Sequence, residues 1–155
     1  MSTRKIKHWG KNAGLAFGRT GYKGMKGEHW FADYYRAKGF KVELFEASRT
    51  KQLAGIDIKL ITESGLEYTI DVKNNLKTDN SFFVEVKSDG WLFNPKYTND
   101  FVSHVNPATG VIATYVRKRM QKFIQDNYWD HRNEILRLNK DDPNLEFIKW
   151  TFTKE

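Results

Sequence analysis

Hydrophobic and polar residues alternate along several short segments of the chain, which is the pattern of half-buried β-strands. Turn-forming stretches such as Glu63-Ser64-Gly65 and Asn106-Pro107 separate these segments and favour hairpin connections. The strands predicted in this way span residues 40–47, 56–62, 66–73, 81–87, 101–105, 110–115 and 145–152.

Two other segments carry apolar residues at helical spacing. The first runs from Glu28 to Lys38 and is followed by Gly39, a common helix stop. The second begins at Val116, and its pattern is compatible with a continuation through residues 128–138. A helix, several strands and a second helix together predict an α/β (α+β) domain. Two polar, basic surfaces are expected on it, a loop at Ser48–Gln52 and the outer face of the second helix, with Arg117, Lys118, Arg119 and Lys122.

The strands at 56–62 and 66–73 are predicted to bring two carboxylates together. Each strand has one apolar face, and both faces enter the same core only if Ile58 pairs with Ile70. The three-residue connection between the strands permits this register. It places Asp57 directly opposite Asp71, with Lys73 on the same face as Asp71. Like charges at that spacing repel each other, and a divalent cation is the obvious group to offset the repulsion.

This arrangement suits phosphodiester hydrolysis. Two carboxylates in bridging range suit Mg²⁺ or Mn²⁺, and the amine of Lys73 could orient or deprotonate a water or neutralise charge on a phosphate. Two alternatives remain open from the residues themselves. Acidic and basic side chains are common on the solvent face of a hairpin, and Glu85-Val86-Lys87 is a second acid-x-Lys triplet on a predicted strand.

The charge of the chain points to a polyanionic partner. The net charge is +7, and residues 1–27 hold seven basic residues and no acidic one. Subtracting these seven from the 26 basic residues leaves 19, which balances the 19 acidic residues. Residues 1–27 are also rich in glycine and contain aromatic rings, so they are predicted to form a flexible arm for nucleic acid, followed by a single domain at 28–155. The simpler interpretation of the arm is a solvated tail.

Several classes of protein are excluded by what the sequence lacks. The 155 residues contain no cysteine, so disulfides, thiolate zinc sites and cysteine nucleophiles are excluded. No apolar run approaches the roughly 20 residues that cross a bilayer, and no apolar segment follows the basic start. A phosphate-binding loop of the G-x-x-x-x-G-K-[ST] type is missing. We therefore expect a cytoplasmic protein (in the host cytoplasm if the source is a virus), with no membrane contact and no nucleotide cofactor.

The order of a helix with an acid, a strand, an Asp, a hairpin and Asp-x-Lys resembles the PD-(D/E)XK nuclease superfamily, over about residues 24–73. By position, Asp57 matches the acid that opens the second strand, and Asp71 and Lys73 match the D/E and K of the signature. Glu28 matches an acid often found on the first helix near the metal. One departure is that Ile56, and not the proline of the signature, precedes Asp57, although many members also lack that proline.

The resemblance implies a restriction-endonuclease-like core, with a mixed central sheet flanked by helices, and a DNA endonuclease that depends on Mg²⁺ or Mn²⁺. Asp57, Asp71 and the carbonyl of Val72 would hold the ion, Lys73 would position or activate water, and Glu28 would assist. Members of this size usually act as homodimers. Within the superfamily the chain looks most like archaeal-type Holliday-junction resolvases, in which a basic loop before the Asp contacts DNA.

DNA is accordingly the expected partner. A non-catalytic nucleic-acid-binding protein that uses the basic arm is the alternative. The residues expected to hold the DNA backbone are Arg4, Lys5, Lys7, Lys11, Arg19, Lys23, Arg49 and Lys51.

Overall fold

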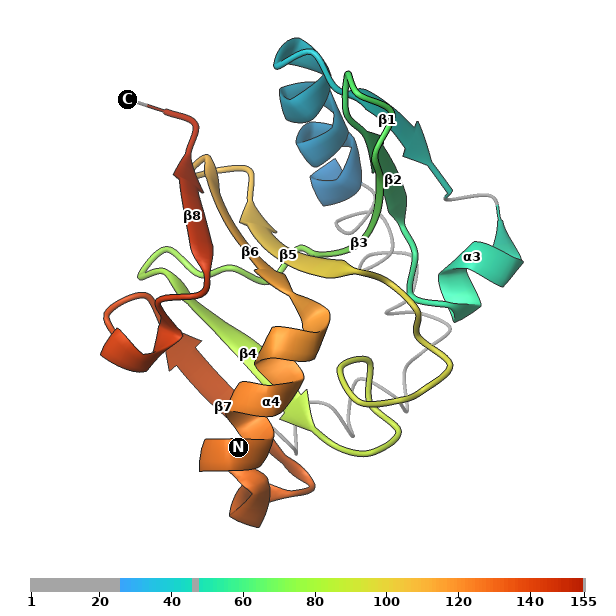
Figure 1. Ribbon diagram of the computed structural model, residues 1–155. Helices are drawn as coiled ribbons and strands as arrows, with labels where there is room; N and C mark the ends of the chain where they lie inside the picture. The colour runs from blue at the N-terminus through green and yellow to red at the C-terminus, as the bar shows by residue number, and fades with distance from the viewer. Residues whose placement is uncertain (1–25, 46–47, 155) are drawn as a thin grey trace, which may run out of the picture.

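Eight strands form two sheets in residues 26–45 and 48–154, the part of the chain that the computed structural model describes (Figure 1). A helix over residues 26–37 precedes the first strand. The strands are β1 (Lys41–Leu44), β2 (Ile58–Ile61), β3 (Glu67–Lys73), β4 (Ser81–Val86), β5 (Phe101–Asn106), β6 (Val111–Val116), β7 (Glu134–Asn139) and β8 (Lys149–Phe152). The remaining elements are the helices α3 (Arg49–Leu53) and α4 (Arg117–Asn127) and the 3-10 turns η1 (Trp129–His131) and η2 (Pro143–Leu145).

The central sheet is mixed, as predicted. Its six strands follow the order β1-β2-β3-β5-β6-β8. Each neighbouring pair is antiparallel except β3 and β5, which are parallel. The strands β4 and β7 pair antiparallel to form a separate two-stranded sheet. The domain is therefore an α/β (α+β) fold with a mainly antiparallel central sheet flanked by helices.

The hairpin between β2 and β3 has the predicted register. Ile58 pairs with Ile70, and Leu60 pairs with Tyr68. The turn between them contains Gly65 at φ +88°, a conformation that glycine adopts without the strain that a Cβ atom causes. The even-numbered side chains of both strands enter a core beneath the helix 26–37, formed by Phe31, Ala32, Val42, Ile58, Leu60, Ile70, Val72, Val105 and Ile112.

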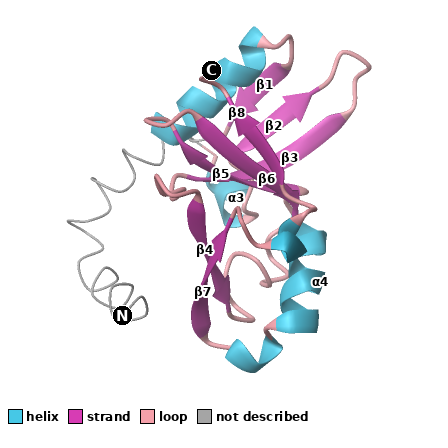
Figure 2. Ribbon diagram, turned by 90° about the vertical axis from the view of Figure 1, so that its left-hand side faces the viewer, coloured by secondary structure: helices cyan, strands magenta, loops and turns pink. Residues whose placement is uncertain are grey.

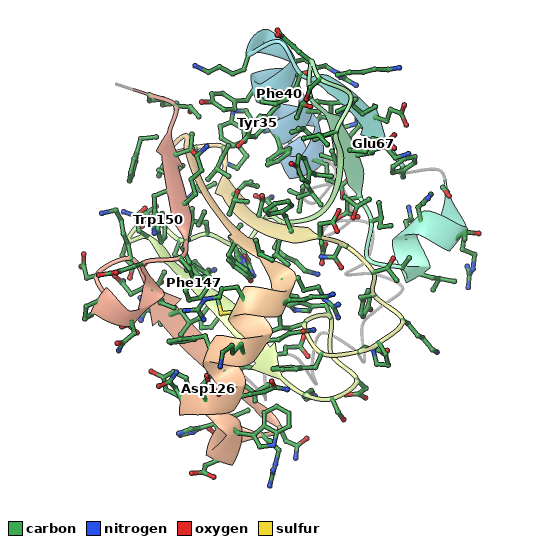
Figure 3. The ribbon with its side chains drawn as sticks, in the orientation of Figure 1. Tyr35, Phe40, Glu67, Asp126, Phe147 and Trp150 are labelled. Carbon is green, nitrogen blue, oxygen red and sulfur yellow. The ribbon has the colours of Figure 1, made fainter. Side chains whose placement is uncertain are left out.

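A second core lies between α4 and the two-stranded sheet. Both ribbon views place α4 beside β4 and β7, at the opposite end of the molecule from the helix 26–37 (Figures 1 and 2). Its buried residues include Phe82, Val84, Val86, Leu138, Met120, Phe123 and Ile124. Phe147 and Trp150, labelled in Figure 3, pack against this core, whereas Tyr35 and Phe40 meet at the other end with ring centroids 5.6 Å apart.

Three local predictions were wrong. The segment 128–138 does not continue α4, because the chain turns through η1 and through Asn133 at φ +72° and then forms β7. The segment 48–52 is not a loop but lies mostly in the short helix α3, which Ser48 caps by accepting a hydrogen bond from the Lys51 N–H at 3.3 Å. The terminal strand begins at Lys149, not at Leu145, which ends η2.

Arg117 is also not part of the outer basic face of α4. It is 7% exposed, and its guanidinium donates hydrogen bonds to the backbone carbonyls of Trp91, Asn94 and Tyr97. Lys118, Arg119 and Lys122 are exposed, as predicted. Within the described ranges, no helix is long and apolar enough to cross a bilayer.

Candidate active site

Asp57 and Asp71 meet at the open end of the β2–β3 hairpin, where β2 begins and β3 ends. The Asp57 N–H donates to the carbonyl of Ile70 at 3.0 Å, which extends the strand pairing by one residue beyond β2. Its side chain turns toward β3, where Oδ2 accepts the backbone N–H of Val72 at 2.8 Å. The carboxyl groups of Asp57 and Asp71 share a hydrogen bond. Strand register therefore brings together the two acids that the sequence placed opposite each other.

The two carboxyl groups cannot both be ionised without a large cost. The pKa of Asp57 is raised to about 9, mainly by burial and also by the charge of Asp71, the hydrogen bond to Asp71 and the charge of Glu28. The hydrogen bond from the Val72 N–H lowers this pKa but does not outweigh the other causes. Asp71 itself is 5% exposed. At neutral pH the pair therefore holds a proton, or a cation takes the place of that proton.

Lys73 completes the cluster. Its Nζ lies 3.3 Å from Oδ2 of Asp71, and its side chain is 28% exposed. Burial tends to lower the pKa of Lys73, but attraction to Asp71 and Asp57 outweighs burial, so the pKa is raised. The amine is therefore charged at neutral pH and acts as a hydrogen-bond donor.

Glu28 approaches the same cluster from the helix 26–37. The first turn of this helix packs closely on the ends of β3 and β5, since a Cβ atom at Gly27 would lie 3.1 Å from Asn74 and 3.2 Å from Val105. Glu28 is half-buried, and its charge contributes to the raised pKa of Asp57. The structure thus brings the four predicted catalytic residues to one region of the domain.

The segment that leads into Asp57 is fixed by tight packing. Gly55 has φ +73°, and a Cβ atom on it would lie 2.4 Å from Cδ1 of Tyr97. The Thr98 N–H donates to the carbonyl of Ala54 at 2.8 Å. The loop 87–100 therefore presses on the chain two residues before Asp57.

Sequence reasoning missed a buried polar chain next to Lys73. His104 on β5 is the register partner of Lys73 and is fully buried. Its Nδ1 lies 2.6 Å from Oδ1 of Asn75, and its Nε2 lies 2.7 Å from the hydroxyl of Tyr115. Because an amide oxygen only accepts, Nδ1 donates its hydrogen and Nε2 accepts the hydroxyl hydrogen of Tyr115. Burial and the charge of Lys73 lower the pKa of His104, so the ring is neutral.

The predicted DNA contacts are described only in part. Arg49 is exposed on α3, and Lys51 is half-buried with its Nζ 5.5 Å from the centre of the Phe45 ring. The arm residues expected to contact DNA lie outside the described residues: Arg4, Lys5, Lys7, Lys11, Arg19 and Lys23.

The competing triplet is placed elsewhere. Glu85 pairs with Ile135 in the two-stranded sheet, and Lys87 follows β4.

An open pocket of about 600 Å³ lies where β3 and β5 begin and β6 ends. Tyr68, Tyr97, Phe101 and Lys118 are among its lining residues, but neither aspartate nor Lys73 lines it.

The donor set fits a hard divalent cation. In the described ranges no three His, Asp or Glu side chains are grouped to hold a metal by themselves, so side chains supply the two carboxylates and the remaining ligands would come from elsewhere. The carbonyl of Val72 is one candidate, because the N–H and C=O of a strand residue point to the same side and this N–H bonds Asp57. Carboxylates, a carbonyl and water or phosphate oxygens are ligands that Mg²⁺ prefers.

Comparison with known proteins gives a likeness of fold. The structure is similar to that of a bacterial homing endonuclease, I-Ssp6803I, with a TM-score of 0.54 and 12% sequence identity. The match covers 83% of this chain and 86% of that chain. No protein-family model and no curated protein matches the sequence. The likeness shows that the chain has a nuclease-like fold.

Proposed function

We propose that this chain is a metal-dependent DNA endonuclease of the PD-(D/E)XK type that hydrolyses phosphodiester bonds. The observation that carries the proposal is the hydrogen-bonded pair Asp57 and Asp71, with the Lys73 amine 3.3 Å from the second carboxylate. A buried pair of like charges lowers stability unless it holds a proton or a cation, and a hydrolytic metal site uses that same property. The fold shared with a homing endonuclease supports an endonuclease reaction.

Each residue of the cluster has a distinct role in this proposal. Asp57, Asp71 and the Val72 carbonyl would hold Mg²⁺ or Mn²⁺, which when bound supplies Lewis-acid activation of a phosphoryl oxygen and of water. Lys73 donates hydrogen bonds that orient the attacking water or offset charge on a phosphate oxygen. Glu28 adds negative charge on the Asp57 side, which favours retention of the cation or of a second one.

The proposed substrate is DNA held by basic side chains. Arg49 and Lys51 lie on α3, a few residues before Asp57, and the basic residues of the 1–27 arm would add sequence-independent contacts to phosphates. A homodimer would let two sites cut two strands. Branched DNA, such as a Holliday junction, is the structured substrate that the resolvase resemblance favours.

The rival function is a non-catalytic nucleic-acid-binding protein, which the basic arm favours. Under this alternative, DNA binding survives Asp71→Asn, depends steeply on salt and requires no divalent cation. The nuclease is also expected to bind DNA as Asp71→Asn, so binding alone does not separate the two functions. Cleavage by the natural chain with Mg²⁺ and its absence in EDTA separate them, because the rival cuts DNA under neither condition.

The test of the nuclease is a cleavage assay on plasmid, single-stranded and four-way-junction DNA, each with Mg²⁺ and with Mn²⁺. We expect cleavage of at least one substrate by the natural chain and a loss of about 100-fold or more in Lys73→Ala. Lys87→Ala, in the second acid-x-Lys triplet, is the matched control and should cleave normally. Failure to cut any of the substrates with either cation would refute the proposal.

A further inference from the structure

The amine of Lys73 is held from two directions. Its Nζ lies 3.3 Å from Oδ2 of Asp71 and 4.9 Å from the centre of the Trp91 ring. An ammonium group near the face of an indole is attracted by the ring quadrupole. The carboxylate and the ring together restrict a side chain that otherwise has four rotatable bonds.

The indole of Trp91 rests on buried rings. The rings of His104 and Phe82 stack with centroids 4.1 Å apart, and the ring of Trp91 meets His104 edge-on at 6.0 Å. Phe82 and His104 are both fully buried. The hydrogen bond that His104 Nδ1 donates to Oδ1 of Asn75 and the one that Nε2 accepts from the Tyr115 hydroxyl fix the imidazole in its plane. The column Phe82–His104–Trp91 therefore runs from the second core to the lysine amine.

Arg117 binds the backbone of the loop that carries Trp91. Its guanidinium donates to the carbonyl of Trp91 at 3.4 Å, of Asn94 at 2.9 Å and of Tyr97 at 2.8 Å. Three carbonyls along one loop thus converge on a single, nearly buried cation. This fixes the loop that carries both Trp91 and Tyr97, and Tyr97 packs on Gly55 just before Asp57.

We propose that Trp91 is a positioning residue that holds the Lys73 amine beside Asp71, and that Arg117 fixes the loop that carries Trp91. The inference rests on the proposed nuclease function and deepens it, because it assigns residues outside the carboxylate hairpin to the alignment of the amine. A functional group must be held to within a fraction of an ångström for efficient catalysis, and its support must be rigid.

The kinetic test compares Trp91→Leu with Trp91→Phe. The Leu variant removes the ring, and we expect kcat to fall about 10-fold or more while KM and the Kd for DNA stay within about twofold. The Phe variant keeps an aromatic face under the amine and should restore kcat to within about threefold of the natural chain. A purely structural role would lower the folded fraction, not kcat of the folded enzyme. If Trp91→Leu does not fold, Trp91→Met supplies a flexible apolar side chain for the same comparison.

A second readout does not depend on cleavage. Competitive acetylation of the amines, followed by mass spectrometry, measures the reactivity of Lys73 relative to the other lysines. Loss of the covering ring should increase the reactivity of Lys73 several-fold in Trp91→Leu and less in Trp91→Phe. The matched control is Phe83→Leu, which removes the ring 5.9 Å from Lys77 and should leave Lys73 unchanged.

The two hypotheses fail in different ways. If Trp91→Leu keeps the natural kcat and the natural Lys73 reactivity, the positioning role of Trp91 is refuted and the nuclease proposal still stands. A natural chain that cleaves no DNA would refute the nuclease and any catalytic role for Trp91. Equal kcat losses in the Leu and Phe variants would also contradict the hypothesis that the aromatic face positions the Lys73 amine.

Discussion

Oδ2 of Asp57 accepts the backbone N–H of Val72 at 2.8 Å, and this bond turns the Asp57 carboxyl toward that of Asp71. The bond joins a residue just before β2 to a residue within β3, so the pairing of two strands sets the spacing of the acids. A site built on paired strands is held more rigidly than one built on loops. The cost of this arrangement is repulsion between two buried carboxylates, which several measurements can detect.

The stability of the metal-free protein should fall as pH rises toward 9. The pKa of Asp57 is raised in the folded chain, whereas the unfolded chain releases this proton near the ordinary value of 3.8. Between these values the folded state keeps a proton that the unfolded state has lost, so stability decreases with pH by at most about 1.4 kcal/mol per unit. Asp57→Asn lacks this contribution.

Urea unfolding in EDTA at a series of pH values from 6 to 9 measures the effect. We expect the free energy of unfolding of Asp57→Asn to exceed that of the natural chain increasingly as pH rises. Glu85→Gln, an acid on β4 outside the site, should follow the natural chain. Parallel profiles for the natural chain and Asp57→Asn would show that the acids do not share a proton.

Divalent cations should stabilise the folded chain, and more strongly at higher pH. A cation that binds the folded state raises Tm, and here it must displace the proton that the acids share. The Tm increase caused by millimolar Mn²⁺ should therefore be larger at pH 8 than at pH 6 and should disappear on addition of EDTA. Asp71→Asn should show little of this increase. An equal increase in natural and Asp71→Asn protein would place the bound cation elsewhere.

The register of the hairpin could be predicted because two patterns agreed. Alternating apolar residues fixed which faces are buried, and the turn at 63–65 has the length that pairs Ile58 with Ile70. The strand β7 was not predicted, because the apolar residues of 134–139 follow a helix without a strong stop signal, and their partner β4 lies about 50 residues earlier. Long-range pairing of this kind leaves no local pattern.

The supporting residues of the site were missed for a related reason. Trp91, His104 and Arg117 come from a loop, a strand and a helix that the parallel pairing of β3 with β5 brings together. Parallel pairing needs a long connection, and nothing local in the sequence shows which strands will pair this way. Helical spacing placed Arg117 on the outer face of α4. That prediction was wrong because its three carbonyl partners belong to a distant irregular loop, which the local pattern does not reveal.

Gly55→Ala should damage the protein more than Gly65→Ala. Both glycines have positive φ, at +73° and +88°, so alanine costs about 1–2 kcal/mol of backbone strain at either position. At Gly55 the new Cβ would also lie 2.4 Å from the Tyr97 ring, whereas nothing lies within 4 Å at Gly65. The extra overpacking should cost about 1–3 kcal/mol. Equal losses in urea unfolding would mean that the loop does not press on the chain before Asp57.

Arg117→Met should destabilise the domain by about 2–4 kcal/mol, because three backbone carbonyls lose a nearly buried, charged donor. Lys118→Met changes the adjacent, exposed residue and should alter stability by no more than about 0.5 kcal/mol. The difference in Tm between these two variants is the measurement. Similar Tm values would contradict the role of Arg117 in holding the loop 87–100.

The most direct test of the central hypothesis is nicking of supercoiled plasmid DNA by purified protein with Mn²⁺, Mg²⁺ or EDTA. Under the proposed function we expect nicking with a divalent cation, none in EDTA, and the loss of nicking in Asp71→Asn and Lys73→Ala while DNA binding is retained. Nicking that persists in EDTA, or that survives both substitutions, would show that the aspartate pair and its lysine do not form the active site.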